Sequence, residues 1–455
     1  MLIRFWGTRG SLAKPGPTTL RYGGNTSCVE VRTADGTLIV LDCGTGAHGL
    51  GQSLESGGSP PLRGHLLITH THWDHIQGFP FFAPLFGPRN EWDIYAPGGL
   101  GQELERTLAG QMEYTYFPVT LEQLGATIRY HDLVEGSFAL GGVRVVAKYL
   151  NHPALALGYR LEVGSRAVVY SVDHEPHAPH VVDANTRALA GVSVPPVHAE
   201  DRRHVEFLAG ADLVIHDAQY SLDEYSQKTG WGHSPAEWAV DYALAAGAKR
   251  LALTHHDPLR DDQAVDRLVE VCRRRSAAAG DGLEVFGAAE GQVLELAERV
   301  GTEAQPASRG TTATPGVGPE TILVADDDPT IVKLLTHSLE PSGFRVLTAS
   351  DGETALRLAR AERPALLLLD WQMPGLSGVE VTRALRTDAD PRLRELPVVL
   401  ITAQAGVENT SVGFAAGVTD YLTKPFRPAH VRARVHAWLM RRGADSGGRT
   451  SENSE

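Results

Sequence analysis

The sequence predicts an α/β protein of two domains, a mixed α/β sandwich followed by a doubly wound parallel sheet. The chain has 455 residues, which is more than one ordinary domain contains. Residues 301–319 are rich in Gly, Pro, Thr, Ser and Ala and lack a core pattern, so we expect a flexible linker there. The segments on its two sides order their strands and helices differently, which indicates two fold types.

The N-terminal domain is expected to span residues 1–300. Short apolar runs in it have the length and composition of β-strands and end in Gly-rich or polar loops. Helical patterns lie between several of them, notably at 235–247. This irregular alternation is typical of a mixed α/β sandwich. The expected strands are 3–7, 28–32, 37–42, 66–69, 143–150, 158–163, 167–172, 212–216 and 250–255.

The C-terminal domain is expected to span residues 320–442, before a polar tail, 443–455, that is predicted to be disordered. Apolar strands alternate regularly with helical stretches in it, which predicts a parallel, doubly wound sheet. The expected strands are 321–326, 344–349, 365–370, 397–402 and 420–424.

Composition excludes several classes of protein. The formal net charge of −13 argues against broad nucleic-acid binding, which needs a basic surface. No apolar run is long enough to span a membrane, and the N-terminus lacks the apolar region of a signal peptide. The three cysteines have neither disulfide-framework nor zinc-finger spacing. We therefore expect a cytoplasmic protein that does not bind membranes.

The segment LLITHTHWDH at 66–75 is the most specific feature. It places His70, His72, Asp74 and His75 in the pattern H-x-H-x-D-H after an apolar strand. Such a loop can aim several ligands at one point, and imidazole with carboxylate suits zinc, manganese or iron. The alternative is a His-rich surface loop, but four such groups in six residues after a buried strand rarely arise without a function.

Three later strands each deliver one further ligand candidate where they end. His152 follows the strand at 143–150, Asp173 follows the strand at 167–172, and His255 or His256 ends the strand at 250–255. Adjacent strand residues point to opposite faces, so only one of the two adjacent histidines is expected to bind metal.

With the ordered ligands H-x-H-x-D-H, His, Asp and His, residues 1–298 resemble the metallo-β-lactamase superfamily. The resemblance implies an αββα sandwich with two divalent metal ions, zinc being expected and manganese or iron the alternatives. It implies the following ligands: His70, His72 and His152 for one metal, Asp74, His75 and His255 for the other, and Asp173 as the bridge. Asp42 matches the aspartate that supports these ligands from behind, although a cap on its Gly-rich turn is an alternative role.

Two further segments, ADLVIHDAQY and GWGHSP, resemble RNase Z and its phosphodiesterase relatives. The matching residues are His216, expected behind the ligands, and Asp217 and His233, expected in catalysis; Asp217 stands where those relatives carry Glu. The stretch between His152 and Asp173 is too compact for the long arm of RNase Z. A small-substrate phosphodiesterase is therefore expected rather than a tRNA-processing enzyme.

His233 is also expected to lie at the start of a helix. Ser234 as N-cap, Pro235 as the first helical residue and Glu237 as the third would form a capping box. The positive end of a helix favours anions, so His233 there suits a phosphate oxygen, unless it is only a structural neighbour of the cap.

The expected reaction is hydrolysis of a phosphodiester such as a cyclic nucleotide. Two metal ions about 3.5–4 Å apart activate water for in-line attack on phosphorus. His233, or a water held by Asp74, protonates the leaving alkoxide. Two alternatives stay open: hydrolysis of a lactone or thioester at the same metals, and a non-catalytic sensor whose metal pair binds a ligand.

Residues 320–440 resemble response-regulator receiver domains, with polar residues after each of four strands. The resemblance implies a flavodoxin-like (βα)5 fold in which Asp370 is phosphorylated and an acidic pocket binds Mg²⁺. The pocket residues are Asp326, Asp327 and Asp370, and the switch residues are Thr402, Tyr421 and Lys424. A degenerate receiver that is not phosphorylated is the alternative.

The two resemblances together predict a two-component signalling protein, a hydrolase regulated by phosphorylation of its receiver domain. The expected partners are a sensor histidine kinase or a phosphotransfer protein, and a small phosphodiester as substrate. Self-association into a homodimer is left open.

Overall fold

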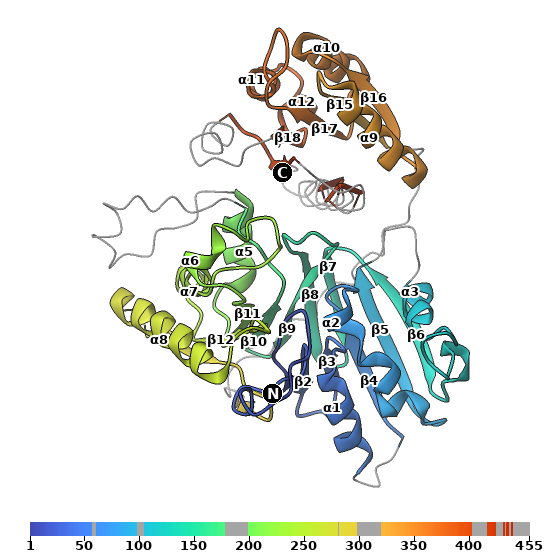
Figure 1. Ribbon diagram of the computed structural model, residues 1–455, viewed down its shortest axis with the longest axis vertical. Helices are drawn as coiled ribbons and strands as arrows, with labels where there is room; N and C mark the ends of the chain where they lie inside the picture. The colour runs from blue at the N-terminus through green and yellow to red at the C-terminus, as the bar shows by residue number, and fades with distance from the viewer. Residues whose placement is uncertain are drawn as a thin grey trace, which may run out of the picture. The chain divides into compact units, whose positions relative to one another are not determined.

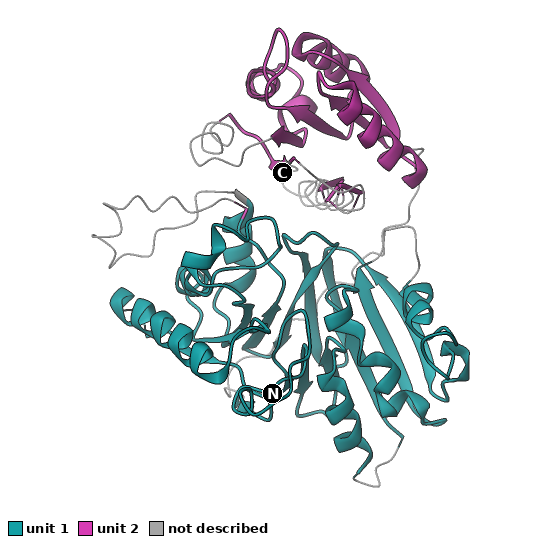
Figure 2. Cartoon of the chain, in the orientation of Figure 1, with its two compact units in different colours: residues 1–176, 182–310 teal, residues 177–181, 311–455 magenta. Residues whose placement is uncertain are grey.

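The computed structural model (Figure 1) describes residues 1–56, 61–97, 104–177, 199–280, 282–297, 320–402 and 416–424, and six positions between 431 and 439. The chain forms two compact units, residues 1–176 with 182–310 and residues 177–181 with 311–455 (Figure 2). The predicted linker, 301–319, and tail, 443–455, lie outside the described residues.

The first unit contains two seven-stranded mixed sheets (Figure 1). In the first sheet the strands from β3 to β6 are parallel and the other neighbours are antiparallel. Its order is β14 (Val293–Glu295), β1 (Leu2–Gly7), β2 (Cys28–Arg32), β3 (Leu38–Leu41), β4 (Arg63–Leu67), β5 (Glu91–Pro97) and β6 (Thr127–Leu133).

The second sheet joins an antiparallel half, β7 to β10, to a parallel half, β10 to β13. Its order is β13 (Glu284–Gly287), β12 (Arg250–Thr254), β11 (Leu213–Asp217), β10 (Arg166–Ser171), β9 (Leu157–Val163), β8 (Val143–Tyr149) and β7 (Gly136–Leu140). In both sheets the parallel strands send their carboxyl ends to one edge, where polar loops can converge.

Helices cover the outer face of each sheet, which gives the predicted αββα layers. The first sheet is covered by α1 (Gly46–Glu55), α2 (Trp73–Ile76) and α3 (Leu104–Gln111), and the second by α5 (Ala199–Leu208), α7 (Ala236–Ala245) and α8 (Asp262–Ala279). Shorter elements are α6 (Leu222–Tyr225) and the 3-10 turns Phe79–Phe81, Ala83–Phe86 and Leu121–Gln123. None of the described helices has the length and apolar character needed to cross a membrane.

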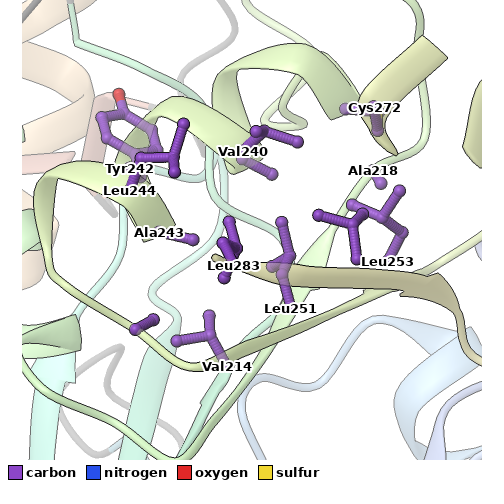
Figure 3. Packing of buried hydrophobic residues seen from close by; sticks show 14 of the residues in the cluster. Val214, Ala218, Val240, Tyr242, Ala243, Leu244, Leu251, Leu253, Cys272 and Leu283 are labelled. Atoms are coloured by element: carbon purple, nitrogen blue, oxygen red, sulfur yellow. The ribbon is translucent and has the colours of Figure 1, made fainter. Parts of the chain in front are cut away.

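The packing of α7 and α8 on the second sheet anchors the carboxyl ends of β11 and β12 (Figure 3). Val240 of α7 and Cys272 of α8 lie in one buried cluster with Leu253, near the end of β12, and Ala218, which follows β11. Replacing a buried leucine such as Leu251 by Ala costs about 2–5 kcal/mol. This core therefore holds the strand ends in fixed positions.

All nine strands predicted for the first unit are present, but further strands, and the positions of helices other than α7, were not predicted. The unpredicted β6 alternates half-buried with exposed residues at the edge of its sheet, so it lacks a continuous apolar run. The other elements without a predicted position are β5, β7, β13, β14, α1, α3, α5 and α8.

The predicted capping box at Ser234 is wrong. Helix α7 begins at Ala236, and Pro235, with extended backbone, occupies the N-cap position. The Ser234 hydroxyl donates instead to the carbonyl oxygen of His174 at 2.6 Å, and the Glu237 carboxylate accepts from the backbone N–H of Leu222 at 3.0 Å. The two side chains that the sequence pattern predicted to cap the helix therefore make hydrogen bonds to distant parts of the chain instead.

The second unit confirms the predicted doubly wound fold. Its five parallel strands have the order β16, β15, β17, β18, β19, which is the flavodoxin-like order. Apolar cores lie on both faces of the sheet. The strands are β15 (Thr321–Ala325), β16 (Arg345–Ala349), β17 (Leu366–Asp370), β18 (Val398–Thr402) and β19 (Asp420–Thr423), and the described helices include α9 (Pro329–Leu339), α10 (Gly352–Glu362), α11 (Gly378–Arg386) and α12 (Pro391–Arg394).

Candidate metal centre

The motif H-x-H-x-D-H occupies the loop after β4 and the first turn of α2. His70, Asp74 and His75 are buried, whereas His72 is exposed. His72 has extended backbone at the N-cap of α2, and Asp74 and His75 lie in the helix itself. The change from extended to helical backbone within this motif turns its side chains toward one point.

Three other strand ends deliver side chains to the same point. His152 follows β8, Asp173 follows β10 and His255 follows β12. Asp173 and His255 both have φ of 59°, and Asp42, which follows β3, has φ of 58°. The left-handed region is uncommon for residues other than glycine, costs about 1–3 kcal/mol and is concentrated at functional sites. At these positions it turns the side chain out of the strand direction and into the site.

The predicted ligands form two groups, and in each the ligand atoms lie within 4.8 Å of one another. The first group is His70, His72, His152 and Asp173, and the second is Asp74, His75 and His255. Asp173 faces both groups with different oxygens. Its Oδ2 lies 3.5 Å from Nε2 of His70 and 3.6 Å from Nε2 of His152. Its Oδ1 lies 3.4 Å from Nε2 of His75 and 3.1 Å from Nε2 of His255. This is the arrangement of a carboxylate that bridges two metal ions.

The donor atoms have the spacing and the unmet bonding capacity that a metal pair requires. Tetrahedral zinc with bonds of 2.0–2.1 Å separates its ligand atoms by about 3.3 Å, close to the observed distances. Nε2 of His70, Nε2 of His75 and Oδ1 of Asp173 are buried and make no hydrogen bond within the described structure. Buried polar atoms are normally satisfied, so these atoms fit metal ligands.

The electrostatics differ between the two groups of ligands. Burial lowers the pKa of His152 to about 3 and lowers that of His70 well below its ordinary value, so both imidazoles stay neutral. Burial opposes the charged form of His75, but the carboxylates of Asp74, Asp173 and Asp42 outweigh it and raise the pKa of His75, so His75 would release a proton on binding metal. Burial opposes ionisation of Asp74, but the imidazoles of His75 and His255 outweigh it and lower the pKa of Asp74. Neutral imidazoles and ionised carboxylates are the ligand forms that coordinate divalent ions.

Asp42 lies where it can orient a ligand. Its Oδ2 accepts from Nδ1–H of His75 at 2.8 Å and from the hydroxyl of Tyr170 at 2.9 Å, and its Oδ1 accepts from the backbone N–H of Thr69 at 2.7 Å. Fixing Nδ1–H in this way leaves Nε2 of His75 facing the cluster. The alternative role, a cap on a Gly-rich turn, does not account for these contacts.

Of the adjacent histidines, the structure brings His255 and not His256 into the cluster. Nδ1–H of His255 donates to Oε1 of Gln219 at 2.8 Å, while Nε2 of His256 donates to the carbonyl oxygen of Ala288 at 2.9 Å. A Cβ on Gly10 would lie 2.2 Å from Nδ1 of His255, so this close approach requires glycine. Gln219 and Gly10 are therefore supporting residues that the sequence pattern did not reveal.

His233 lies beside the second group and is held by Asp217. Its Nδ1 donates to Oδ2 of the fully buried Asp217 at 3.0 Å, and its ring stacks on that of His255 with centroids 4.9 Å apart. A ring nitrogen of His233 lies within 4.8 Å of ligand atoms of His255 and Asp173. Burial opposes the charged form, but the carboxylates of Asp217, Asp173 and Asp74 outweigh it and raise the pKa of His233 to about 9. The arrangement places a cationic hydrogen-bond donor against the cluster.

The second unit has a different polar site, at the carboxyl ends of its parallel strands. Asp326 and Asp370 are buried there, and Asp327 is exposed. Nζ of Lys424 donates to Oδ2 of Asp326 at 2.8 Å and to Oδ1 of Asp370 at 2.7 Å. Burial raises the pKa of Asp326. Thr402 ends the neighbouring strand β18, and Tyr421 lies in β19, its side chain outside the described part of the structure.

Comparisons with known proteins assign both units. A model of the β-lactamase superfamily domain matches residues 37–256, and a model of the response regulator receiver domain matches residues 322–436. The chain is a β-lactamase superfamily domain joined to a response regulator receiver domain.

Individual relatives resemble one domain each. The transcriptional regulatory protein PhoP of Bacillus subtilis is 45% identical over 120 residues, which are 26% of this chain and 48% of PhoP. A solved response regulator from Chloroflexus aurantiacus is 36% identical and covers 27% of this chain and 98% of its own, with a TM-score of 0.25. The short form of human tRNase Z is 21% identical and covers 66% of this chain and 100% of its own, with a TM-score of 0.43. The chain spans about half the length of the curated relatives it matches.

The assignments fit what the two sites contain. The β-lactamase superfamily domain carries a buried His/Asp cluster consistent with a dinuclear metal site, as expected of a metal-dependent hydrolase. The receiver domain implies a histidine kinase as partner. The first domain is called the hydrolase domain from here on.

His216 of the hydrolase domain does not lie where it was predicted. It precedes Asp217 in β11, so it points to the opposite face of the sheet. There its Nε2 lies 3.1 Å from Nε2 of His204, and its Nδ1 donates to the carbonyl oxygen of Asp217. His216 therefore packs against α5 and does not support the ligands directly.

Glu175 of the hydrolase domain holds the loop before His233, and no sequence signal singled it out. Its carboxylate accepts from the backbone N–H groups of Gly230 at 2.6 Å and Gly232 at 2.7 Å. The carbonyl oxygen of Gly232 accepts in turn from Nδ1–H of His152 at 3.0 Å. Gly232 has φ of 87°, and a Cβ there would lie 2.2 Å from Nδ1 of His152. A hydrogen-bonded path thus connects Glu175 to the first group of ligands.

Proposed function

We propose that the hydrolase domain is a dinuclear metal-dependent phosphodiesterase for small substrates such as cyclic nucleotides, and that phosphorylation of Asp370 regulates it. The observation that carries this proposal is the position of His233, a cationic donor held by Asp217 against the Asp173-bridged cluster. A phosphodiester is an anion before and during hydrolysis, so a fixed positive charge at this place favours it. A lactone or thioester is neutral and would make less use of that charge.

The roles of the residues follow from their positions. When bound, two metal ions would supply an activated water and offset the negative charge of the phosphate. His70, His72 and His152 would hold one ion, Asp74, His75 and His255 the other, and Asp173 both. His233 donates its proton to the leaving alkoxide, with a water held by Asp74 as the alternative donor. Asp217 keeps the His233 ring oriented and positively charged, so it is a positioning residue.

The receiver site supplies the regulation. Asp370 would accept the phosphoryl group from a sensor histidine kinase or a phosphotransfer protein. Asp326, Asp327 and Asp370 offer the carboxylate oxygens that Mg²⁺ prefers. Lys424, which already contacts Asp326 and Asp370, would then contact the phosphoryl group together with Thr402. A phosphoryl group adds nearly two negative charges at neutral pH, enough to rearrange these contacts.

The proposal is tested with the full chain loaded with zinc, manganese or iron. We expect turnover of bis(p-nitrophenyl) phosphate and of at least one cyclic mono- or dinucleotide, and little turnover of lactones and thioesters. Turnover of a lactone or thioester without any phosphodiester would overturn the proposed substrate class. Absence of all turnover, with an optical spectrum typical of a ligand-binding iron pair, would identify a sensor instead.

A further inference from the structure

Two tryptophans of the hydrolase domain present most of their side chains to solvent. Trp73 is 73% exposed and Trp231 is 59% exposed. A single exposed apolar residue is ordinary, but several gathered around a polar site mark a place where a ligand binds. Whether these two indoles form a binding surface therefore depends on where they lie relative to the metal centre.

Trp73 lies on the open side of the metal centre. Trp73 directly follows His72. His72 is exposed, whereas the other members of the first group of ligands, His70, His152 and Asp173, are buried. His72 is therefore the member of the first group of ligands that faces solvent, and we take its side as the entrance to the site. An aromatic side chain at the next position, the first residue of α2, borders this entrance.

Trp231 lies in the loop that contacts the ligand His152. It precedes Gly232, whose carbonyl oxygen accepts from Nδ1–H of His152. The opposite nitrogen of that ring, Nε2 of His152, lies 3.2 Å from Nδ1 of His72. His152 therefore contacts both Gly232, the residue after Trp231, and His72, the residue before Trp73. Glu175 fixes the loop at Trp231 through its hydrogen bonds to the glycines on both sides.

A positive charge accompanies the second indole. Nζ of Lys228 lies 4.5 Å from the ring centroid of Trp231 and 5.6 Å from that of Tyr220. The Tyr220 ring in turn lies 5.9 Å from that of His233. The ammonium group thus neighbours both the exposed indole and the Tyr220 ring, which in turn neighbours His233.

We infer that Trp73, Trp231 and Lys228, named here the tryptophan rim, bind the nucleoside part of a phosphodiester substrate. Indole faces stack on nucleobases of any sequence, and a neighbouring ammonium attracts the attached phosphate. This inference rests on the proposed phosphodiesterase activity and narrows its substrates to nucleotides. An aliphatic phosphodiester would reach the metals but leave both indoles in water.

The test compares two phosphodiesters that share one leaving group. Thymidine 5′-(p-nitrophenyl phosphate) carries a nucleoside, and methyl p-nitrophenyl phosphate carries a methyl group in its place. Trp73→Ala and Trp231→Ala should each raise KM for the thymidine ester by about 10-fold, the effect of losing one base stack, with kcat/KM for the methyl ester within about twofold of wild type. Lys228→Ala should raise KM for both esters, since both are anions.

Two further variants separate stacking from other effects. Tyr114→Ala removes an aromatic side chain that is 80% exposed and follows α3, which packs on the edge strand β6. It should leave KM for both esters unchanged. Trp73→Phe should retain most of the affinity for the thymidine ester because a smaller ring still stacks.

The outcomes distinguish the rim from the activity itself. Suppose that wild type hydrolyses both esters. If the tryptophan variants then lose the same fraction of kcat/KM on both esters, or lose none, the tryptophan rim does not bind the nucleoside, although the proposed phosphodiesterase activity stands. If wild type hydrolyses neither ester, the proposed activity fails, and quenching of tryptophan fluorescence then tests the rim alone. Quenching by adenosine 5′-monophosphate but not by ribose 5-phosphate, reduced in both tryptophan variants, supports it, and equal responses to the two ligands overturn it.

Discussion

In the hydrolase domain the side chains at the strand ends are imidazoles and carboxylates, nearly all buried, and several buried donor atoms have no hydrogen-bond partner in the described structure. In the receiver domain they are three carboxylates, one of them exposed, and Lys424 already bridges the other two. Both sites use the carboxyl ends of parallel strands, the position where open α/β sheets bind ligands. They differ in what balances the negative charge of the carboxylates: a bound metal ion is expected in the hydrolase domain, whereas Lys424 already does so in part in the receiver domain.

This difference indicates how each site treats its ion. The hydrolase cluster has carboxylates and imidazoles around buried atoms that make no hydrogen bond in the described structure, so a bound ion should be retained tightly. The receiver pocket balances part of its charge with its own lysine and leaves Asp327 open to water. Mg²⁺ bound there keeps several waters and should exchange readily, as a reversible phosphorylation site requires.

The largest expected effect comes from removing the bridge. Asp173→Ala should lose at least one metal ion and lower phosphodiester turnover by about 10⁴-fold, because both ions share this carboxylate. Elemental analysis and turnover of bis(p-nitrophenyl) phosphate measure the two effects. Asp93→Ala, in β5 of the other sheet and paired with His131, is the matched control and should change neither. Two retained ions with full turnover in Asp173→Ala would mean that the bridge is assigned to the wrong residue.

Removing the cationic donor should affect turnover but not the metals. His233→Ala should lower kcat on phosphodiesters by about 10²–10⁴-fold, the usual effect of losing an acid or a charge stabiliser. Metal content should stay at the wild-type value, because Nδ1 of His233 is used by Asp217. An unchanged kcat would return His233 to a structural role.

A matched pair of glycine variants tests how tightly the hydrolase ligands are fixed. Gly230 and Gly232 have φ of 86° and 87°, so alanine strains the backbone equally at both. Only at Gly232 does the added Cβ meet His152, at 2.2 Å, and at Gly230 it meets nothing within 4 Å. Gly232→Ala should therefore weaken metal affinity by about 10–100-fold relative to Gly230→Ala. Equal affinities, measured by competition with a chelator, would show that His152 tolerates displacement.

The smallest expected effect is the coupling between the two domains. Acetyl phosphate with Mg²⁺ should phosphorylate Asp370 and change phosphodiester turnover by about fivefold, the low end of allosteric couplings, or change the assembly state. Asp370→Asn should not respond. If acetyl phosphate changes neither the turnover nor the assembly state of the wild type, or changes them equally in residues 1–300 alone, phosphorylation of Asp370 does not regulate the hydrolase.

The fold was most readily predictable where a strand is one nearly continuous apolar run, as at β3, β17 and β18. The strands that escaped prediction lie mostly toward the sheet edges, where β6 and β7 keep half-buried and exposed residues and the apolar signal weakens. The start of α7 was predicted wrongly because Ser234 and Glu237 match a local pattern but bond to distant backbone groups. Local propensity carries no information about such tertiary partners.

The candidate ligands were predictable because each follows an apolar strand, and the structure brings all seven together. The residues behind them were less accessible from sequence. His216 and Asp217 are neighbours in β11, yet the alternation of the strand sends only Asp217 toward the site. Gln219 and Glu175 act through hydrogen bonds across the fold, and neither residue type nor spacing distinguishes them from surface residues.

The most direct test of this account is the number of metal ions that the full chain retains after gel filtration in metal-free buffer. Because two groups of ligands share Asp173, we predict two transition-metal ions per chain and no retained magnesium. The Asp370→Asn variant should give the same result. One retained ion, or none after reconstitution with zinc, manganese or iron, would contradict a dinuclear centre in the hydrolase domain.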